Sequence, residues 1–299
     1  MARGMPTTAD KTRHLSIEPP PLPRAARYGA ERAEVRCREG LGLRVGRAAA
    51  TRRSLARLRR IGVDPMEGLL TRPPTARGRA RGCMPGEIPH PTWIYRIIHV
   101  DSLDTCLRRR GLHAPRHVPQ DGMAYRSIHR SDIQEGRRER PVPCGPGGTL
   151  SDYVPFYFGR RSVMLYQLKT GRVPGYSEGQ EPILYLVSSV QLVADAGASW
   201  VFSDGHGLKV YTQWYDDLAK LHEVDWNVVN ADYWADTIED PDRQRRKQAE
   251  FLVHRFCDWN LIHGIGVYSS GMEARVQDIM SGHPKEPHPP VKVLKKWYY

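Results

Sequence analysis

One acidic residue, Glu250, stands at the start of an apolar strand pattern and is a candidate reactive-site carboxylate. It follows a polar and basic run, residues 243–247, and precedes apolar and polar residues that partly alternate from Phe251 to Phe256. This pattern predicts a strand buried on one face, with Glu250 at its lip. Neighbouring cations favour the charged form of a carboxylate. For this segment alone, a solvated glutamate at a strand edge is the simpler interpretation.

Three further segments carry residue types that are common in active sites. His99 lies on the first strong strand pattern, Arg137 lies in a long polar segment, and the aromatic residues 153–158 form a second strand pattern. Standard motifs are missing, since the sequence contains no GxGxxG, no Walker loop, no HExxH and no GxSxG. The candidate residues therefore depend on the fold to bring them together.

The pattern of residues 84–299 predicts one mixed α+β domain that is dominated by strands. Residues 113–140 are polar and too long for an ordinary connection, so we expect a functional or disordered loop there. Asp101 suits the N-cap of a short helix and Gly111 its C-cap. Strands are expected at residues 93–100, 153–158, 182–187, 250–256, 261–268 and 291–297, and a strand running into a turn at 201–207. Helices are expected at 191–196, 216–221 and 272–280, a short element at 162–166, and a Trp- and Asp-rich loop at 225–242.

The positive charge of the chain is confined to its first 83 residues. This segment contains 18 Arg and one Lys against seven Asp and Glu, a net +12, whereas residues 84–299 contain 26 basic and 26 acidic residues. Its Arg- and Pro-rich composition predicts a disordered extension, or translated upstream sequence, ahead of Met84. The alternative is a basic arm that neutralises nucleic-acid phosphates. The balanced charge of residues 84–299 argues against broad electrostatic binding by that domain.

Cysteine usage and hydropathy predict a cytoplasmic protein. The five cysteines are odd in number, widely spaced and in no CxxC pair, so we expect neither a disulfide framework nor a metal site. No run of about twenty apolar residues is present to span a membrane. The first 30 residues lack the apolar stretch of a secretory signal.

Short collinear motifs are spread over about residues 90–299. They are Tyr95–His99, Ile133–Glu135, Gly147–Gly148 with Asp152–Phe158, Ser162–Tyr166, Gly179–Leu184, Tyr233–Asp236, Gln248–Val253 and Lys296–Tyr299. Together they resemble the DarT family, the DNA ADP-ribosyltransferase toxins of bacterial toxin–antitoxin systems. The resemblance implies an ADP-ribosyltransferase fold for residues 84–299, a split, twisted β core with short helices, and it leaves the basic extension, residues 1–83, uncovered.

The family resemblance also implies a reaction and its partners. Family members transfer ADP-ribose from NAD to a base of single-stranded DNA, typically thymidine. NAD is consumed as a substrate, so no resident cofactor is expected. A macrodomain antitoxin (DarG) removes the adduct and shields the toxin. The expected partners are therefore NAD, single-stranded DNA and such an antitoxin.

The resemblance assigns roles to particular residues. Glu250 matches the family's catalytic glutamate, which stabilises positive charge on the ribose as the nicotinamide bond breaks. Arg137 matches the essential arginine after the Ile-Gln-Glu signature, with Arg138 as the alternative match. Because a guanidinium stays protonated, we expect Arg137 to polarise thymine and stabilise its anion rather than act as a base. NAD contacts are implied, mainly through the first strand, for Arg96, Ile97, Ile98, His99, Thr105 and Arg137.

Three residues match family positions that hold the flipped target base, namely Tyr157, Met164 and His206. Aromatic and thioether surfaces suit base stacking. Tyr157 equally fits the core of an apolar strand, and His99 equally fits a core histidine with a satisfied hydrogen bond. Family members often carry His where this chain has Arg96, so the side-chain contact at that position stays open.

Two other functions remain open from the sequence. Related transferases modify RNA or protein instead of DNA. The basic extension would also suit a non-catalytic nucleic-acid-binding protein. Labelled NAD offered with DNA, RNA and protein in turn distinguishes these alternatives.

Overall fold

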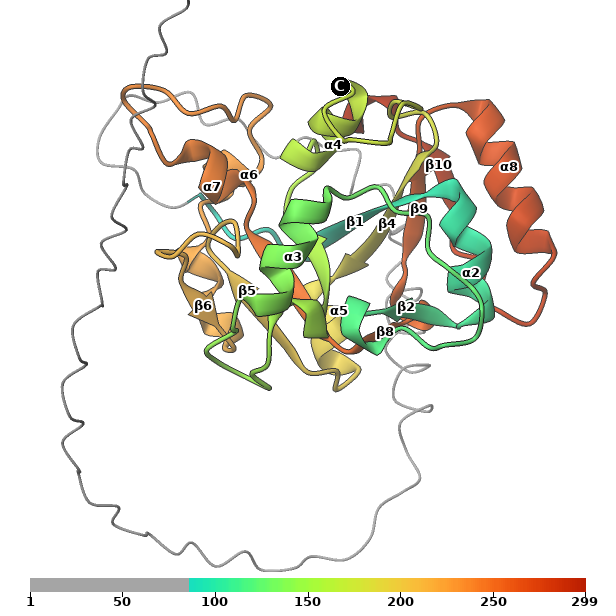
Figure 1. The fold of residues 1–299 in the computed structure, drawn as a ribbon, viewed down its shortest axis with the longest axis horizontal. Coiled ribbons are helices and arrows are strands. Elements are labelled where there is room, and N and C mark those ends of the chain that lie inside the picture. The colour runs from blue at the N-terminus through green and yellow to red at the C-terminus, as the bar shows by residue number, and fades with distance from the viewer. Residues whose placement is uncertain (1–85) are drawn as a thin grey trace, which may run out of the picture. The chain divides into compact units, whose positions relative to one another are not determined.

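The computed structural model describes residues 86–299, and most of its strands form one twisted sheet (Figure 1). The sheet has eight strands in the order β10-β9-β4-β1-β3-β7-β5-β6, in which β9 and β10 are parallel and the other neighbours antiparallel. The expected extension at residues 1–83 lies outside the described residues. The strands are β1 Trp93–His99, β3 Tyr153–Tyr157, β4 Ile183–Ser189, β5 Trp200–Ser203, β6 Trp214–Tyr215, β7 Glu250–His254, β9 Gly264–Val267 and β10 Val291–Val293, with β2 Gly111–His113 and β8 Phe256–Asp258 in a separate pair.

The helices are short and surround the sheet, as predicted for an α+β fold. Across residues 86–299, no helix is long and apolar enough to cross a membrane. The α-helices are α2 Leu103–Arg108, α3 Ser131–Glu139, α4 Val163–Lys169, α5 Val190–Asp195, α6 Trp226–Val229, α7 Arg243–Lys247 and α8 Ser270–Ser281. The 3-10 helices are η1 Val100–Ser102, η2 Pro115–His117, η3 Leu150–Asp152, η4 Leu218–Glu223, η5 Trp259–Leu261 and η6 Lys295–Trp297.

The sheet splits between β1 and β3, as expected of a split β core. β1 pairs with β4 through seven residues and β3 with β7 through five, but β1 and β3 share one register pair, Tyr95 with Tyr157. Pro155 has no N–H to donate, and its carbonyl oxygen accepts a hydrogen bond from Arg96 Nη1 at 2.9 Å. The Arg96 side chain therefore supplies a hydrogen bond between β1 and β3 at the point where the backbone pairing of these strands ends.

Both faces of the sheet are buried, which corrects one expectation for β7. Phe251 and Val253 pack in the core that includes α2 and α8, whereas Leu252 packs in a second cluster on the other face. Glu250 is only 5% exposed. A strand buried on both faces replaces the predicted half-buried strand, and Glu250 is not a solvated glutamate.

Several element boundaries differ from the sequence prediction. Asp101 lies inside η1, where its backbone N–H donates to His99 Nδ1, so His99 is the capping residue. Gly111 begins β2 instead of capping a helix, because α2 ends at Arg108 and Arg109 is its C-cap. A Cβ on Gly111 would lie 2.4 Å from the carbonyl oxygen of Cys257, so the close pairing with β8 requires glycine there. The last predicted strand is a three-residue β10 followed by η6.

Some helices and strands were missed because their residues are polar or few. The polar segment 113–140 contains α3, so Arg137 lies on a helix and not in an irregular loop. The basic run before Glu250 is the short helix α7. The strands β2, β6 and β8 have only two or three residues, too few for a recognisable alternation.

Candidate active site

A buried ion pair joins two residues that are 113 positions apart in the sequence. Arg137 Nη1 on α3 donates to Glu250 Oε1 at 3.0 Å and to Oε2 at 3.1 Å. The two residues are 6% and 5% exposed. Arg137 Nη2 is also buried and has no hydrogen-bond partner among residues 86–299. One guanidinium nitrogen thus holds the carboxylate while another N–H group remains available to a ligand.

The sheet register brings Tyr157 beside the ion pair. Tyr157 stands directly opposite Glu250 across β3 and β7, so both side chains lie on the same face of the sheet. The Tyr157 hydroxyl contacts Met164 Sδ on α4 at 3.8 Å. Burial, and then the charge of Glu250, raise the pKa of Tyr157 well above its usual value. A neutral phenol and a thioether therefore border the carboxylate.

The turn after β5 covers the carboxylate with His206 and Gly207. A Cβ on Gly207 would lie 3.3 Å from Glu250 Oε2, so the turn passes close over this oxygen. The backbone N–H of Leu208 donates to His206 Nδ1 at 3.2 Å, which places the ring proton of a neutral histidine on Nε2. Burial is the main cause that lowers the pKa of His206, and Glu250 opposes it. His206 is thus a neutral donor at this site.

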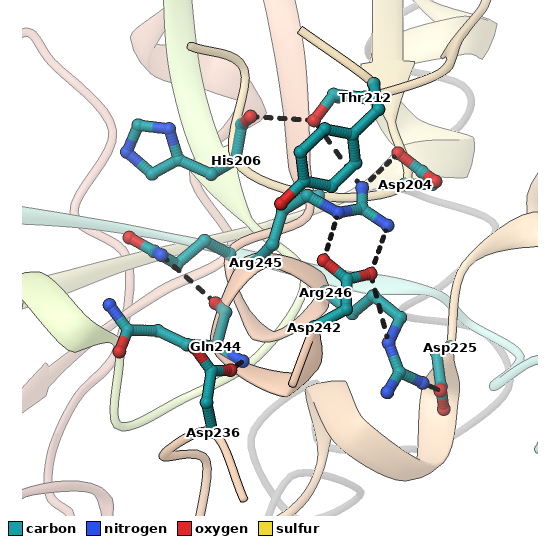
Figure 2. A network of polar contacts seen from close by, with 12 residues as sticks. Asp204, His206, Thr212, Asp225, Asp236, Asp242, Gln244, Arg245 and Arg246 are labelled. Atoms are coloured by element: carbon teal, nitrogen blue, oxygen red, sulfur yellow. Dashed lines mark hydrogen bonds and ion pairs between the residues drawn. The ribbon is translucent and has the colours of Figure 1, made fainter. Parts of the chain in front are cut away.

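Arg245, on α7, holds this turn in place (Figure 2). Its guanidinium forms a two-pronged contact with Asp242, both distances 2.8 Å, and donates to Asp204 Oδ1 at 2.7 Å. Its carbonyl oxygen accepts the backbone N–H of His206 at 3.0 Å. A Cβ on Gly205 would lie 2.3 Å from Arg245 Nη1, so only glycine fits against this side chain. Arg245 therefore positions the turn that carries His206 over Glu250.

Replacing Arg245 with Ala should loosen this turn and slow the reaction. The change leaves Asp204 and Asp242 without their guanidinium, and we expect the free energy of unfolding to fall by about 2–3 kcal/mol. Arg245→Lys keeps the charge, loses the two-pronged contact and should lie between Ala and wild type. Thermal melting and turnover are the measurements. Arg275→Ala, which removes the exposed ion pair with Asp101, is the control and should cost at most about 1 kcal/mol. Wild-type melting and turnover in Arg245→Ala would contradict this positioning role.

A second buried arginine and a neutral histidine lie near Arg137. Arg96 Nε is buried and without a hydrogen-bond partner in the described part of the chain. Burial, followed by the charges of Arg96 and Arg137, lowers the pKa of His129 to about 3. Arg96 and Arg137 thus lie close enough to influence each other's charge, and each has a buried side-chain nitrogen without a partner among the described residues. This arrangement suits an anion that carries several acceptor oxygens, such as a diphosphate.

Backbone groups of β1 also face the split in the sheet. The N–H of Val100 donates to the carbonyl oxygen of Pro182, just before β4. Because backbone groups alternate between the two sides of a strand, those of Ile97 and His99 point away from β4 and into the split. The side chains of Ile97 and Ile98 are buried in the core. The backbone groups of Ile98 face β4, so of these two residues only Ile97 has backbone groups in the split.

The side chains of His99 and Thr105 make their own contacts away from the ion pair. His99 is 1% exposed, with Nε2 at 3.2 Å from Glu178 Oε2 and Nδ1 bonded to the Asp101 N–H. Thr105 Oγ1 donates to the carbonyl oxygen of Ala124 at 3.3 Å. The structure therefore shows a histidine with satisfied hydrogen bonds at position 99, the alternative that the sequence left open.

Within residues 86–299, no group of three or more His, Cys, Asp or Glu side chains could hold a metal ion. Cys106, Cys144 and Cys257 are unpaired thiols. Burial raises the pKa of Cys106 and of Cys257 to about 12, so both are protonated core residues rather than nucleophiles. The polar chemistry of the pocket thus comes from Arg, Glu, His and Tyr.

Comparison with known families shows which family the chain belongs to. The family model described as "ssDNA thymidine ADP-ribosyltransferase, DarT" matches residues 95–299, more than half of the chain. The chain belongs to the DarT family. It is a DNA ADP-ribosyltransferase that uses NAD. Its α+β fold, a large twisted sheet with short helices, is the fold of that family.

Individual DarT relatives are similar over nearly their whole length. A DNA ADP-ribosyl transferase from Thermus sp. (strain 2.9) is 44% identical over 211 residues, 71% of this chain and 98% of the relative. The structure of Thermus sp. 2.9 DarT in complex with ADP-ribosylated ssDNA is 43% identical with a TM-score of 0.68, covering 72% of this chain and 100% of that one. Its complex with NAD+ is 42% identical with a TM-score of 0.65, covering 71% and 100%.

The DarT structure of this chain brings together the predicted catalytic and base-binding residues and adds other residues to the site. Glu250, Arg137, Tyr157, Met164 and His206 converge, and Arg138, the alternative to Arg137, is exposed. The expected cations next to Glu250 in sequence do not contact it: Arg245 and Arg246 pair with aspartates, and Lys247 donates to backbone carbonyls.

Sequence reasoning missed His129 and Arg245. His129 gave no signal beyond lying eight residues before Arg137 in a polar segment. Arg245 stood in a basic run that was interpreted as part of the approach to a strand. The Asp-rich loop upstream of that run, residues 225–242, could have indicated that the arginines of the run form ion pairs with its aspartates.

Proposed function

We propose that the protein transfers ADP-ribose from NAD to a thymidine base of single-stranded DNA and releases nicotinamide. The observation that carries this proposal is the buried Arg137–Glu250 pair, with its unused Nη2, inside a DarT fold. In the reaction, the bond between nicotinamide and the ribose C1 breaks, and a bond from that carbon to the thymine ring nitrogen forms. The nitrogen loses its proton to solvent, and nicotinamide leaves with the bonding electrons.

Glu250 supplies the electrostatic stabilisation in this scheme. Its carboxylate accepts hydrogen bonds from the ribose hydroxyls as positive charge builds on the ring, so it stabilises the transition state more than the ground state. The Arg137 contact and the Gly207 turn fix the carboxylate before substrate binds. Little reorganisation is then needed during the reaction.

Arg137 and His206 act on the thymine base as donors. The unpartnered Nη2 of Arg137 polarises a thymine carbonyl and stabilises the anion that forms when the ring nitrogen loses its proton. His206 presents Nε2–H, because its Nδ1 is already an acceptor. Tyr157 and Met164 provide the surface against which the unstacked base packs.

NAD binds along the split between β1 and β3 in this proposal. The backbone groups of Ile97 and His99 face the split, and Arg96 Nε and Arg137 Nη2 are available for acceptor oxygens of the dinucleotide. Thr105 and the His99 ring support the pocket through their bonds to Ala124 and Glu178. NAD is consumed, and no resident cofactor takes part.

The partner and setting follow from membership of the DarT family. We propose that a macrodomain antitoxin binds this toxin and reverses its modification, and that the reaction takes place in the bacterial cytoplasm. We assign the catalytic domain to residues 84–299, which the family match from 95 to 299 supports, and leave residues 1–83 outside it.

The substrate test offers one thymidine-containing oligonucleotide alone and annealed to its complement, with NAD in excess, and offers RNA and protein in separate reactions. We expect adducts on the single strand and almost none on the duplex, because extruding a paired base costs a few kcal/mol. Mass spectrometry locates the adduct. Equal labelling of both forms contradicts single-strand specificity, and label on RNA or protein alone supports the alternative substrates.

A further inference from the structure

A basic groove of about 690 Å³ lies beside the end of β3 and the C-terminal segment. Its charged lining consists of Arg160, Arg161, Lys295 and Lys296 with a single carboxylate, Asp232. Cations therefore exceed acids by three in this basic groove, although residues 84–299 as a whole carry no net charge. Lys295 and Lys296 are exposed, so their charges reach solvent.

An aromatic pocket of about 470 Å³ adjoins the basic groove, since Asp232 lines both. Its rings are those of Tyr166, Tyr233, Trp234 and Tyr299. Trp234 Nε1 donates to the Tyr299 hydroxyl at 2.6 Å, which fixes two of the rings. Tyr233 is 64% exposed, an unusual state for a large aromatic residue at the edge of a pocket.

The same short segments build these two features and the active site. On α4, Met164 contacts Tyr157 in the site, while Val163, Tyr166 and Gln167 line the aromatic pocket. One helix, about 10 Å wide, thus separates them. On the other side, Lys247 precedes Glu250 by three residues and donates to the carbonyl oxygens of Val229 and Ala231, which line the basic groove.

We propose that the basic groove and the aromatic pocket bind the nucleotides that flank the target base, with phosphates along the cations and a neighbouring base on Tyr233. This inference rests on the proposed function and deepens it. Clustered cations beside an exposed aromatic ring such as Tyr233 are a combination that binds unpaired strands, because the phosphates are neutralised and a free base can stack on the ring. A duplex cannot use the rings, since its bases are already stacked.

The charge test compares two double variants with the same net charge. Lys295→Glu with Lys296→Glu reverses the groove, and Lys220→Glu with Lys285→Glu reverses two exposed lysines elsewhere. For a fluorescent oligothymidylate of about 12 nucleotides, the groove variant should bind about tenfold or more weakly than the control, and its salt dependence should be shallower by about 0.7 for each lost phosphate contact. Equal binding and equal salt dependence of the two variants overturn the proposal.

The length test separates this inference from the proposed function. Wild type should modify a thymidine trinucleotide with a KM at least about tenfold above its KM for the longer strand. In the groove variant, the KM for the longer strand should rise to that for the trinucleotide, while the rate on the trinucleotide stays at the wild-type value. Tyr233→Ala should weaken binding of the longer strand about tenfold, whereas Tyr233→Phe keeps the ring and should match wild type. Wild type that modifies neither strand refutes the proposed function itself.

Thermal melting accompanies each variant. If the Glu pair melts early, Lys295→Ala with Lys296→Ala replaces it, and an unchanged affinity in that folded pair also overturns the groove assignment. The groove assignment is also overturned if the groove variant loses as much activity on the trinucleotide as on the longer strand. The groove would then affect the transfer reaction itself and not the binding of flanking nucleotides.

Discussion

Replacing Glu250 with Gln is expected to lower the rate of ADP-ribosyl transfer by at least about 100- to 1000-fold. The amide has the same shape and keeps one oxygen for Arg137, but it lacks the charge that stabilises the ribose cation. Because Glu250 acts on the ribose, nicotinamide release in the absence of DNA should fall by a similar factor. Both rates can be followed by mass spectrometry of the products.

The choice of substitution matters at this position because the side chain is buried. Glu250→Ala should also abolish transfer, but it leaves the Arg137 guanidinium buried and unpaired, at a cost of about 3–5 kcal/mol in the free energy of unfolding. Glu250→Gln should melt much closer to wild type. A folded Gln variant with wild-type transfer would rule out Glu250 as the catalytic carboxylate.

Arg137→Lys is expected to reduce transfer to DNA by about 100- to 1000-fold. An ammonium group can pair with Glu250, yet it cannot also present the second N–H that Arg137 Nη2 holds unused. If that N–H polarises the base, DNA modification should fall far more than nicotinamide release without DNA. This ratio separates a role in base activation from a role in NAD binding.

Arg138 provides the matched control on the same helix. It is exposed, one residue from Arg137, and was the alternative match to the family's essential arginine. Arg138→Lys should retain both rates. An equal fall of nicotinamide release and DNA modification in Arg137→Lys would move Arg137 from base activation to the NAD site, and a loss in Arg138→Lys would restore the alternative.

The sequence by itself determined the fold class and the family, and it singled out Glu250 and Arg137 as the candidates for catalysis. Strands such as β1, β3 and β4 are long enough for their apolar patterns to be recognised, and collinear motifs placed Glu250 and Arg137 within a known family. These are local properties of short segments, and they survive without knowledge of which segments are neighbours. The thymidine specificity and individual site roles remain predictions that the experiments above test.

Only the tertiary structure decided which cation pairs with Glu250 and which residues position the active-site side chains. Arg137 is 113 positions away, whereas the adjacent Arg245 turns to Asp204 and Asp242 and supports the His206 turn instead. The Arg96 bond to Pro155 and the burial of β7 on both faces likewise depend on how the sheet splits and what covers it. Sequence neighbours on a short helix point in different directions, so an ion pair is set by the packing of distant elements and not by proximity along the chain.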